Sequence, residues 1–107
     1  MSDTKTLYDP KDLENKVHEL KTWKPYFSQV LYGFKTFEVR KNDRDFQEGD
    51  WLKLKEWDNE TKNYTGQFLH RRIGYILHGG QFGIEEGYVV MQLEEIALGP
   101  FNVDVKY

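Results

Sequence analysis

Lys35, Glu38 and Arg40 are the residues of this sequence whose types and spacing best suggest chemistry. They lie in a short stretch where Phe37 and Val39 alternate with polar and charged side chains. Such alternation predicts a strand with one apolar face and one ionic face. If the ionic face lines a cleft, the three side chains can form a site. If it meets water, they form surface ion pairs worth under about 1 kcal/mol.

A lysine beside a carboxylate in a partly buried site can move a proton or stabilise an oxyanion. Lys35 and Glu38 are therefore the candidate catalytic residues, provided that the chain bends where it leaves Gly33. Arg40, on the same face as the carboxylate, would pair with it or bind an anionic or carbonyl-bearing ligand.

Other polar residues are candidates for ligand binding around that face. His18 and Lys21 belong to a predicted strand at residues 16–21. They reach the ionic face if the two strands are neighbours, and lie on a solvated edge if they are not. Asn42 and Arg44 most simply form a turn that is held by side-chain hydrogen bonds. In the alternative interpretation they lie at the rim of the binding site and contact a base edge or a ribose.

Residues 79–87 are rich in glycine and carry Gln81 and Phe82 near their centre. They lack the lysine that a phosphate-binding P-loop requires, so a flexible rim over a cleft is the better interpretation and a plain connector the alternative. Phe82 and Trp57 lie near predicted turns and are the candidates for stacking on a base. Trp23 and Tyr26 have helical spacing and are assigned to the core.

The helix and strands that must position these residues are predicted from two spacings of apolar side chains, one helical and one of period two. Apolar side chains from residue 23 to 34 repeat as on one face of a helix, with Thr22 as the expected cap, Pro25 in the first turn and Gly33 as terminator. Residues 51–57 and 64–77 alternate as a long hairpin around a turn at 58–63, and residues 88–96 form the last strand. We expect one α+β domain over residues 1–107, built on a curled antiparallel sheet with one main helix. Residues 1–15 are expected to be an irregular N-terminal segment, and residues 97–107 a tail or edge strand.

Composition narrows the classes of function. The chain has 107 residues, of which 38% are hydrophobic, 31% charged and 16% aromatic, which is typical of one folded domain. Its net charge is −3, so tight non-specific binding to duplex nucleic acid is not expected. The absence of cysteine excludes disulfides, thiolate zinc sites and a thiol nucleophile.

No metal or cofactor is expected, because His18, His70 and His78 lack the spacing of metal ligands. No apolar run approaches the roughly 18 residues needed to span a bilayer. The first residues have no hydrophobic signal core, so a cytoplasmic location and no membrane partner are expected.

The strand and its surroundings resemble a known family. The segment GFKTFEVR at residues 33–40, after an amphipathic helix and before Gly49-Asp50, is similar to the signature of ASCH domains, which are relatives of the PUA domain. The resemblance extends to a small bacterial and phage family of ASCH-like proteins through HELK at 18–21, KTFEVRKNDR at 35–44, GGQFG at 79–83 and GYVVM at 87–91. It covers residues 17–96.

This resemblance implies that the curled antiparallel sheet is a small PUA-like β-barrel, a pseudobarrel whose cleft between helix and sheet faces RNA or a modified nucleoside. Some small ASCH proteins are amidohydrolases that remove the acetyl group from acetylated cytidine. Their catalytic lysine corresponds to Lys35 and a strand arginine to Arg40. Their catalytic threonine falls where this chain has Glu38, and Thr36, which matches a different threonine of the motif, is a candidate ligand-binding residue.

Three functions are therefore open. The first is a binding module for RNA, a nucleotide or a modified base, in a cleft lined by Lys35, Glu38 and Arg40. The second is a small amidohydrolase acting on an acylated nucleoside. The third is a phage or host interaction module that uses an acidic surface, because residues 81–107 carry one basic and five acidic side chains.

Overall fold

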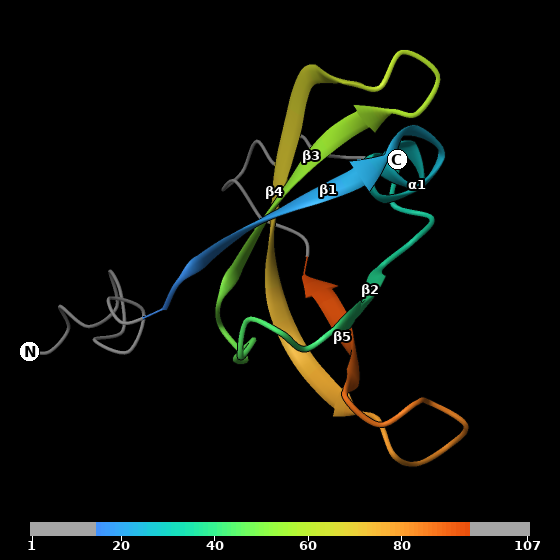
Figure 1. The fold of residues 1–107 in the computed structure, drawn as a ribbon. Helices are drawn as coiled ribbons and strands as arrows, with labels where there is room; N and C mark the ends of the chain where they lie inside the picture. The colour runs from blue at the N-terminus through green and yellow to red at the C-terminus, as the bar shows by residue number, and fades with distance from the viewer. Residues whose placement is uncertain (1–14, 95–107) are drawn as a thin grey trace, which may run out of the picture.

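The computed structural model describes residues 15–94, which form one curled sheet and a single helix. In chain order the elements are β1 (Val17–Trp23), α1 (Lys24–Leu31), β2 (Phe37–Lys41), β3 (Trp51–Asp58), β4 (Asn63–His78) and β5 (Tyr88–Glu94). The strand order is β1-β3-β4-β5-β2, so β1 and β2 are the two edges (Figure 1). The predictions for residues 1–15, apart from Asn15, and for 97–107 lie outside the described residues.

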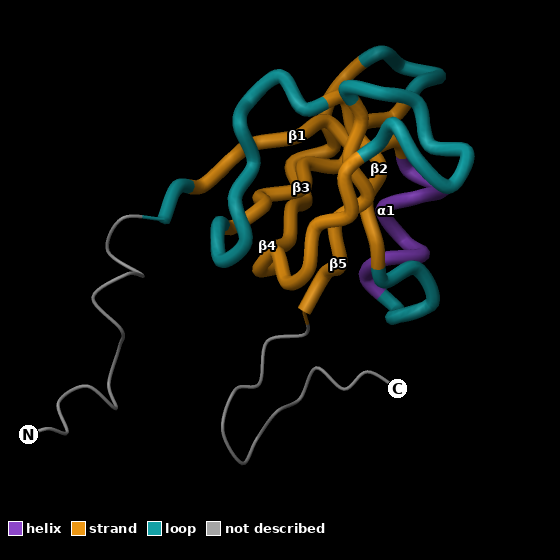
Figure 2. The backbone as a smooth tube through the Cα atoms, turned by 90° about the horizontal axis from the view of Figure 1, so that it is seen from below, coloured by secondary structure: helices purple, strands orange, loops and turns teal. Residues whose placement is uncertain are grey.

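The small curled sheet with one helix is confirmed, but the sheet is mixed, which corrects the expectation that all of its strands pair antiparallel. Strands β3, β4, β5 and β2 pair antiparallel, whereas β1 runs parallel to β3. Parallel pairing needs a long crossover, and the chain between β1 and β3 supplies one because it contains α1, β2 and a turn. The curled strands form a half-barrel whose edge strands, β1 and β2, are not paired with each other. Figure 2 shows the curl of the sheet from below.

The hydrophobic core fills the inside of the curl. The buried apolar side chains come from every strand except β2, from α1 through Phe27 and Val30, and from the turn between β2 and β3 through Phe46. The alternation predicted for residues 51–57 and for the last strand is confirmed, because Leu52 and Leu54 are fully buried and Met91 is as well. In β4, a register shift between Ile73 and Ile76 interrupts the alternation and turns the next inward position to Ile76.

The helix is shorter than the apolar pattern predicts. It starts directly after β1, so its N-cap is Trp23 and the predicted capping by Thr22 is wrong. Pro25 lies in the first turn and Gly33 has a φ of 84°, as predicted for the helix ends. The apolar pattern predicted from residue 23 to 34 therefore runs past both ends of the helix, and only Phe27 and Val30 of the helix are buried. Other apolar residues of the predicted stripe face outward: Trp23 is 45% exposed and Tyr26 is 55% exposed.

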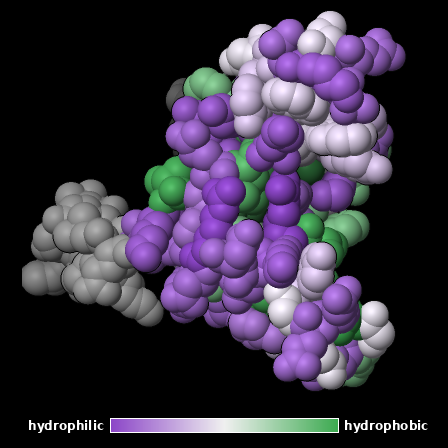
Figure 3. Space-filling view, in the orientation of Figure 1, coloured by the Kyte–Doolittle hydropathy of each residue, from purple (hydrophilic) through white to green (hydrophobic). Residues whose placement is uncertain are grey.

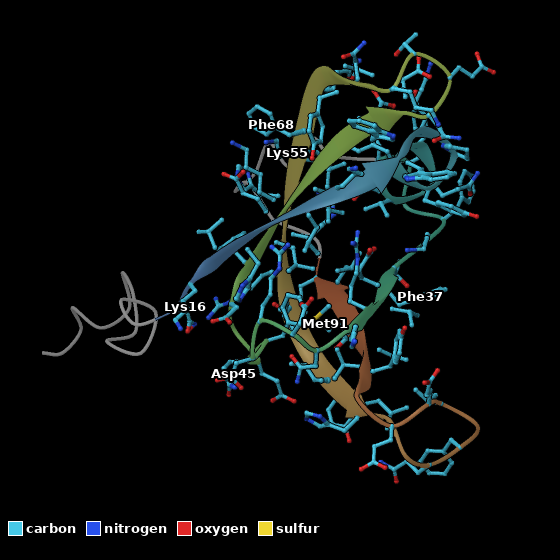
Figure 4. The ribbon with its side chains drawn as sticks, viewed as in Figure 1. Lys16, Phe37, Asp45, Lys55, Phe68 and Met91 are labelled. Atoms are coloured by element: carbon cyan, nitrogen blue, oxygen red, sulfur yellow. The ribbon has the colours of Figure 1, made fainter. Side chains whose placement is uncertain are left out.

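Strand β2 turns its ionic face inward. Glu38 lies opposite Met91 of β5 and is only 5% exposed, whereas Phe37 and Val39 on the other face are 45% and 48% exposed. Figure 4 shows Phe37 directed away from the sheet, with Met91 on its inner side. The inward orientation of Glu38 places the candidate chemistry inside the curl of the half-barrel.

Candidate ligand-binding site

A cavity of about 500 Å³ opens between the two edge strands. Its lining comes from the end of β1, the first turn of α1, the segment before β2, and β2 itself. The residues are Lys21, Thr22, Trp23, Tyr26, Lys35, Glu38, Val39 and Arg40. The volume lies within the range of pockets that hold small molecules, about 300 to 1,000 Å³.

The carboxylate of Glu38 is held between two cations in the wall of this cavity. Lys35 Nζ lies 3.0 Å from Glu38 Oε1, and Arg40 Nε lies 2.7 Å from Oε2. The Glu38 side chain is 6% exposed, whereas those of Lys35 and Arg40 are 21% and 28% exposed. The alternative of a solvated surface ion pair is therefore excluded, because the acidic partner is buried.

The backbone after α1 brings Lys35 to this position. Gly33 adopts a positive φ, and the amides of Phe34 and Lys35 both donate to the Gln29 carbonyl oxygen, 2.9 Å away in each case. The chain therefore folds back over the helix end before it enters β2. Lys35 Nζ also donates to the Phe37 carbonyl at 2.8 Å, which fixes the ammonium group beside the start of the strand. The bend expected at Gly33 is confirmed.

Two arginines connect the unpaired edges of the half-barrel. Arg40 Nη2 donates to the Lys21 carbonyl at 2.8 Å, and Arg44 Nη1 donates to the Glu19 carbonyl at 2.6 Å. These bonds satisfy backbone acceptors of β1 that a neighbouring strand would otherwise take. They hold β1 and β2 close to each other without a ladder of backbone hydrogen bonds, and the cavity lies in that opening.

Thr22 is the cavity residue with unmet hydrogen-bonding capacity. It is 3% exposed, and among residues 15–94 its Oγ1 is the buried side-chain polar atom that has no partner. A buried hydroxyl without a partner costs about 1 to 3 kcal/mol, so such groups usually have a function or a ligand. Trp23 and Tyr26 stand beside it with large exposed rings. The assignment of these two aromatic residues to the core is wrong.

The lining combines positive charge, hydrogen-bonding groups and aromatic surface. Lys21, Lys35 and Arg40 are cationic and Glu38 is the one acidic member. Lysine and arginine carry more N–H groups than the bonds described above use, so donors remain for a ligand. The arrangement suits a planar molecule that carries a negative charge or several acceptor oxygens, with an exocyclic donor for Glu38 or Thr22.

His18 does not line the cavity but forms a buried pair with Asp50. Its Nε2 lies 2.7 Å from Asp50 Oδ2, and its ring packs edge-on against Phe46 at 4.8 Å between centroids. Burial raises the pKa of Asp50, but the bonds from His18 and from the backbone amides of Lys16 and Gln47 outweigh it, and the pKa is lowered. The pair joins the start of β1, the turn after β2 and the start of β3.

The remaining predicted ligand-binding residues lie outside the cavity lining. Asn42 Oδ1 accepts from the Phe46 amide at 2.9 Å, which confirms the side-chain-bonded turn. Thr36 is exposed at the entry to β2. Gln81 donates to the His78 carbonyl, and Phe82 is 79% exposed in the loop between β4 and β5.

The sequence signals for the other lining residues are weak. The spacing of Thr22, Trp23 and Tyr26 predicts the cap and core face of a helix, although an edge strand that ends directly at a helix also fits these residues. Alternation places Val39 on the apolar face of β2, and the structure makes that face the outer one. Recognising that Trp23 ends a strand would have identified the aromatic side of the cavity.

Within residues 15–94, no three His, Asp or Glu side chains gather where a metal ion could bind. No helix in this part of the chain has the length and apolar character needed to cross a membrane.

The fold and the cavity define a small half-barrel domain with a polar, aromatic-lined site between its edge strands. The chain belongs to the family described as "Domain of unknown function (DUF3850)", whose model matches residues 17–93. It is also similar to the "Uncharacterized 12.9 kDa protein in GpA 3'region" of Escherichia phage P2, with 43% identity over 58 residues. The match covers 54% of this chain and 51% of the phage protein, so the chain spans about half the length of the curated relative that it matches.

Proposed function

We propose that this protein is an ASCH-like, PUA-like domain that binds RNA or a modified nucleoside in the cavity between β1 and β2. The observation that carries the proposal is the cavity wall itself, where a buried carboxylate lies between two cations and close to an unpartnered hydroxyl. A half-barrel whose open side holds the site is consistent with the pseudobarrel that the resemblance implies.

Each group in the cavity has a complementary part on a nucleotide. Lys35 and Arg40 would donate to phosphate or carbonyl oxygens. Glu38 would accept from an exocyclic amine, and Thr22 would exchange a hydrogen bond with a base edge or a ribose hydroxyl. Trp23 and Tyr26 provide exposed ring faces on which a base can stack.

A second candidate function is hydrolysis of an acylated, cytidine-type nucleoside. It is favoured by the 3.0 Å contact between Lys35 Nζ and Glu38 Oε1 in a partly buried site. Glu38 would take a proton from a water that attacks the acyl carbon, and the Lys35 ammonium group would stabilise the negative charge that forms on the acyl oxygen. Glu38 would then give that proton to the exocyclic nitrogen as the amide C–N bond breaks, which releases the acid and the free exocyclic amine.

One screen tests both candidates. Thermal unfolding is measured with nucleosides, nucleoside monophosphates and short RNAs, including acetylated cytidine, and the products are analysed by mass. A ligand at 100 times its Kd stabilises the folded state by about 2.7 kcal/mol, which a thermal shift detects readily. Arg40→Gln is the cavity variant, and Lys41→Gln, which removes the neighbouring exposed charge of the same strand, is its control.

Stabilisation by a nucleoside or RNA that Arg40→Gln loses and Lys41→Gln keeps supports binding. Release of acetate that Lys35→Ala abolishes in a folded protein supports hydrolysis. If no nucleoside, nucleotide or RNA raises the unfolding temperature, the proposed function is wrong.

A further inference from the structure

The outer face of β1, β3 and β4 carries four rows of residues that run across the three strands. Cross-strand partners point to the same side of a sheet, so the register defines each row. The rows are Val17, Trp51 and Arg72; then Glu19, Lys53 and His70; then Lys21, Lys55 and Phe68; and finally Trp23, Trp57 and Tyr64. None of these residues is buried.

This set, the outer face, is rich in aromatic and basic residues. It contains all three tryptophans of the chain together with Phe68 and Tyr64. Four of its members are lysine or arginine and one, Glu19, is acidic, although the whole chain has a net charge of −3. The positive charge is therefore local, and it coincides with aromatic side chains on the solvent side of the sheet.

Lysines and rings are paired closely on the outer face. Lys21 Nζ lies 3.9 Å from the centroid of a Trp57 ring, Lys53 Nζ 4.3 Å from Phe68, and Lys55 Nζ 4.7 Å from Tyr64. Figure 4 shows Lys55 and Phe68 close to each other, at a distance from Phe37. Phe68 and Tyr64 are 52% and 46% exposed, so a planar ligand can reach them.

The outer face continues into the cavity. Lys21 and Trp23 belong to both, because β1 is an edge strand and the cavity opens along that edge. Figure 3 shows strongly hydrophilic side chains over the middle of the sheet and paler ones toward its end beside α1. A bound chain could therefore run across β4 and β3 to β1 and place one base in the cavity.

We propose that the outer face binds a single-stranded nucleic acid whose bases stack on its aromatic rings and whose phosphates contact its lysines. The inference deepens the proposed function and rests on it for the placement of one base in the cavity. A base that stacks on Phe68 or Tyr64 replaces the lysine ammonium over that ring. The flexible stem of the lysine then brings its charge to a neighbouring phosphate. A duplex hides its base faces and would bind more weakly.

The test is fluorescence anisotropy with a labelled, unstructured 12-nucleotide RNA, its DNA counterpart and the matching duplex. The double variant Lys53→Gln/Lys55→Gln removes two phosphate contacts. We expect at least tenfold weaker binding and a smaller salt dependence, with the slope of log K against log salt reduced by about 1.4 for the two contacts. Phe68→Leu keeps an apolar side chain and removes the ring, and should weaken binding by about fivefold or more. The control Lys41→Gln removes one exposed charge from β2, outside the outer face.

The outcomes separate this inference from the proposed function. If the single strands bind and the two outer-face variants match the wild type, or if no single strand binds at low salt, the inference is overturned. Equal binding of duplex and single strand would also overturn it, since stacking on the rings would then contribute nothing. If the outer-face variants lose binding while Arg40→Gln and free nucleosides have no effect, the outer face stands and the cavity proposal fails.

Discussion

Replacing Glu38 tests the ionic arrangement of the site at a single residue. Its carboxylate is 6% exposed and contacts Lys35 and Arg40, both of which reach the cavity. Glu38→Gln keeps the volume but leaves two cations without their counter-charge. We expect a loss of about 2 kcal/mol in the free energy of unfolding, measured by urea denaturation. The reason is that burial shields the ion pairs of Glu38 from water, so their loss is costly.

The control for Glu38→Gln is Glu86→Gln, an exposed carboxylate in the loop between β4 and β5. It should change the free energy of unfolding by less than about 0.5 kcal/mol. If both variants behave alike, Glu38 has the energetics of a surface ion pair and the buried arrangement described above is incorrect.

For Thr22 we expect the opposite of the Glu38 result: a substitution that leaves stability intact and weakens ligand binding. Its hydroxyl has no partner in the folded protein, so Thr22→Val removes a buried polar group without breaking a bond. Stability should stay equal or rise by up to about 1 kcal/mol, while the affinity for a ligand in the cavity falls. Thermal unfolding with and without the best ligand of the nucleoside screen measures both quantities. A large loss of stability with unchanged affinity would show that the hydroxyl has a structural bond.

The junction of β1, β3 and the turn between β2 and β3 depends on Asp50. Its folded-state pKa lies below the ordinary value of 3.8, so the stability that it contributes is present above that value and is lost as the pH falls through the folded-state pKa. Asp50→Asn should cost about 2 kcal/mol at neutral pH, since hydrogen bonds to a charged group are lost.

Urea denaturation at a series of pH values tests this expectation. The gap between wild type and Asp50→Asn should narrow only below about pH 4, where the carboxyl group of the unfolded chain starts to take up a proton while the folded protein, with its lowered pKa, still holds Asp50 ionised. Asp43→Asn is the matched control, because the Asp43 side chain is 65% exposed in the same turn. A gap that stays constant down to pH 2 would rule out a contribution from the Asp50 charge.

The loop between β4 and β5 begins at Gly79, where the backbone is packed too closely for any other residue. A Cβ on Gly79 would lie 1.9 Å from the Glu85 carbonyl oxygen, which is backbone and cannot move aside cheaply. Gly79→Ala should therefore lower the free energy of unfolding by about 2 kcal/mol or more. Gly83→Ala in the same loop meets no atom within 4 Å and should cost about 1 kcal/mol from its positive φ alone. Equal effects in denaturation would mean that the loop opens around residue 79 without penalty.

Element types could be predicted from the sequence, but their orientation could not. Period-two alternation identified β2 as a strand, yet it defines two faces without saying which one is inside. The ionic face of β2 points inward because Lys35 and Arg40 neutralise Glu38 there, and Arg40 finds a carbonyl acceptor at Lys21, far away in the chain. The parallel pairing of β1 with β3 is a contact between distant segments and leaves no local signal.

At the scale of the whole molecule, the site exists because the half-barrel is open. Sequence patterns identified Lys35, Glu38 and Arg40, which lie close together in the chain. They did not identify Thr22, Trp23 and Tyr26, which reach the same cavity only when β1 and β2 become the two edges. The cavity is a property of the curl and of its unpaired edges, and no local pattern encodes it.

The bridges between the edges should control how easily the opening widens. Arg44 lies outside the cavity lining but donates to the Glu19 carbonyl at 2.6 Å. Arg44→Gln should accelerate hydrogen exchange of β1 amides about fivefold, corresponding to about 1 kcal/mol, while the central strands β4 and β5 keep their protection. Lys41→Gln removes a charge from the same region without a bridge and should leave β1 unchanged. Uniform acceleration in all strands would show a global loss of stability instead.

Hydrogen exchange also separates the two proposed modes of binding. A ligand inside the cavity contacts residues of both edges, so amides of β1 and β2 should exchange more slowly together. A nucleic acid bound only to the outer face contacts β1, β3 and β4 and should leave the exchange rates of the β2 amides unchanged. A short RNA that protects β2 as well as the outer face must therefore place part of its chain between the edges. Protection of β2 that survives Arg40→Gln would contradict the role given to the cavity.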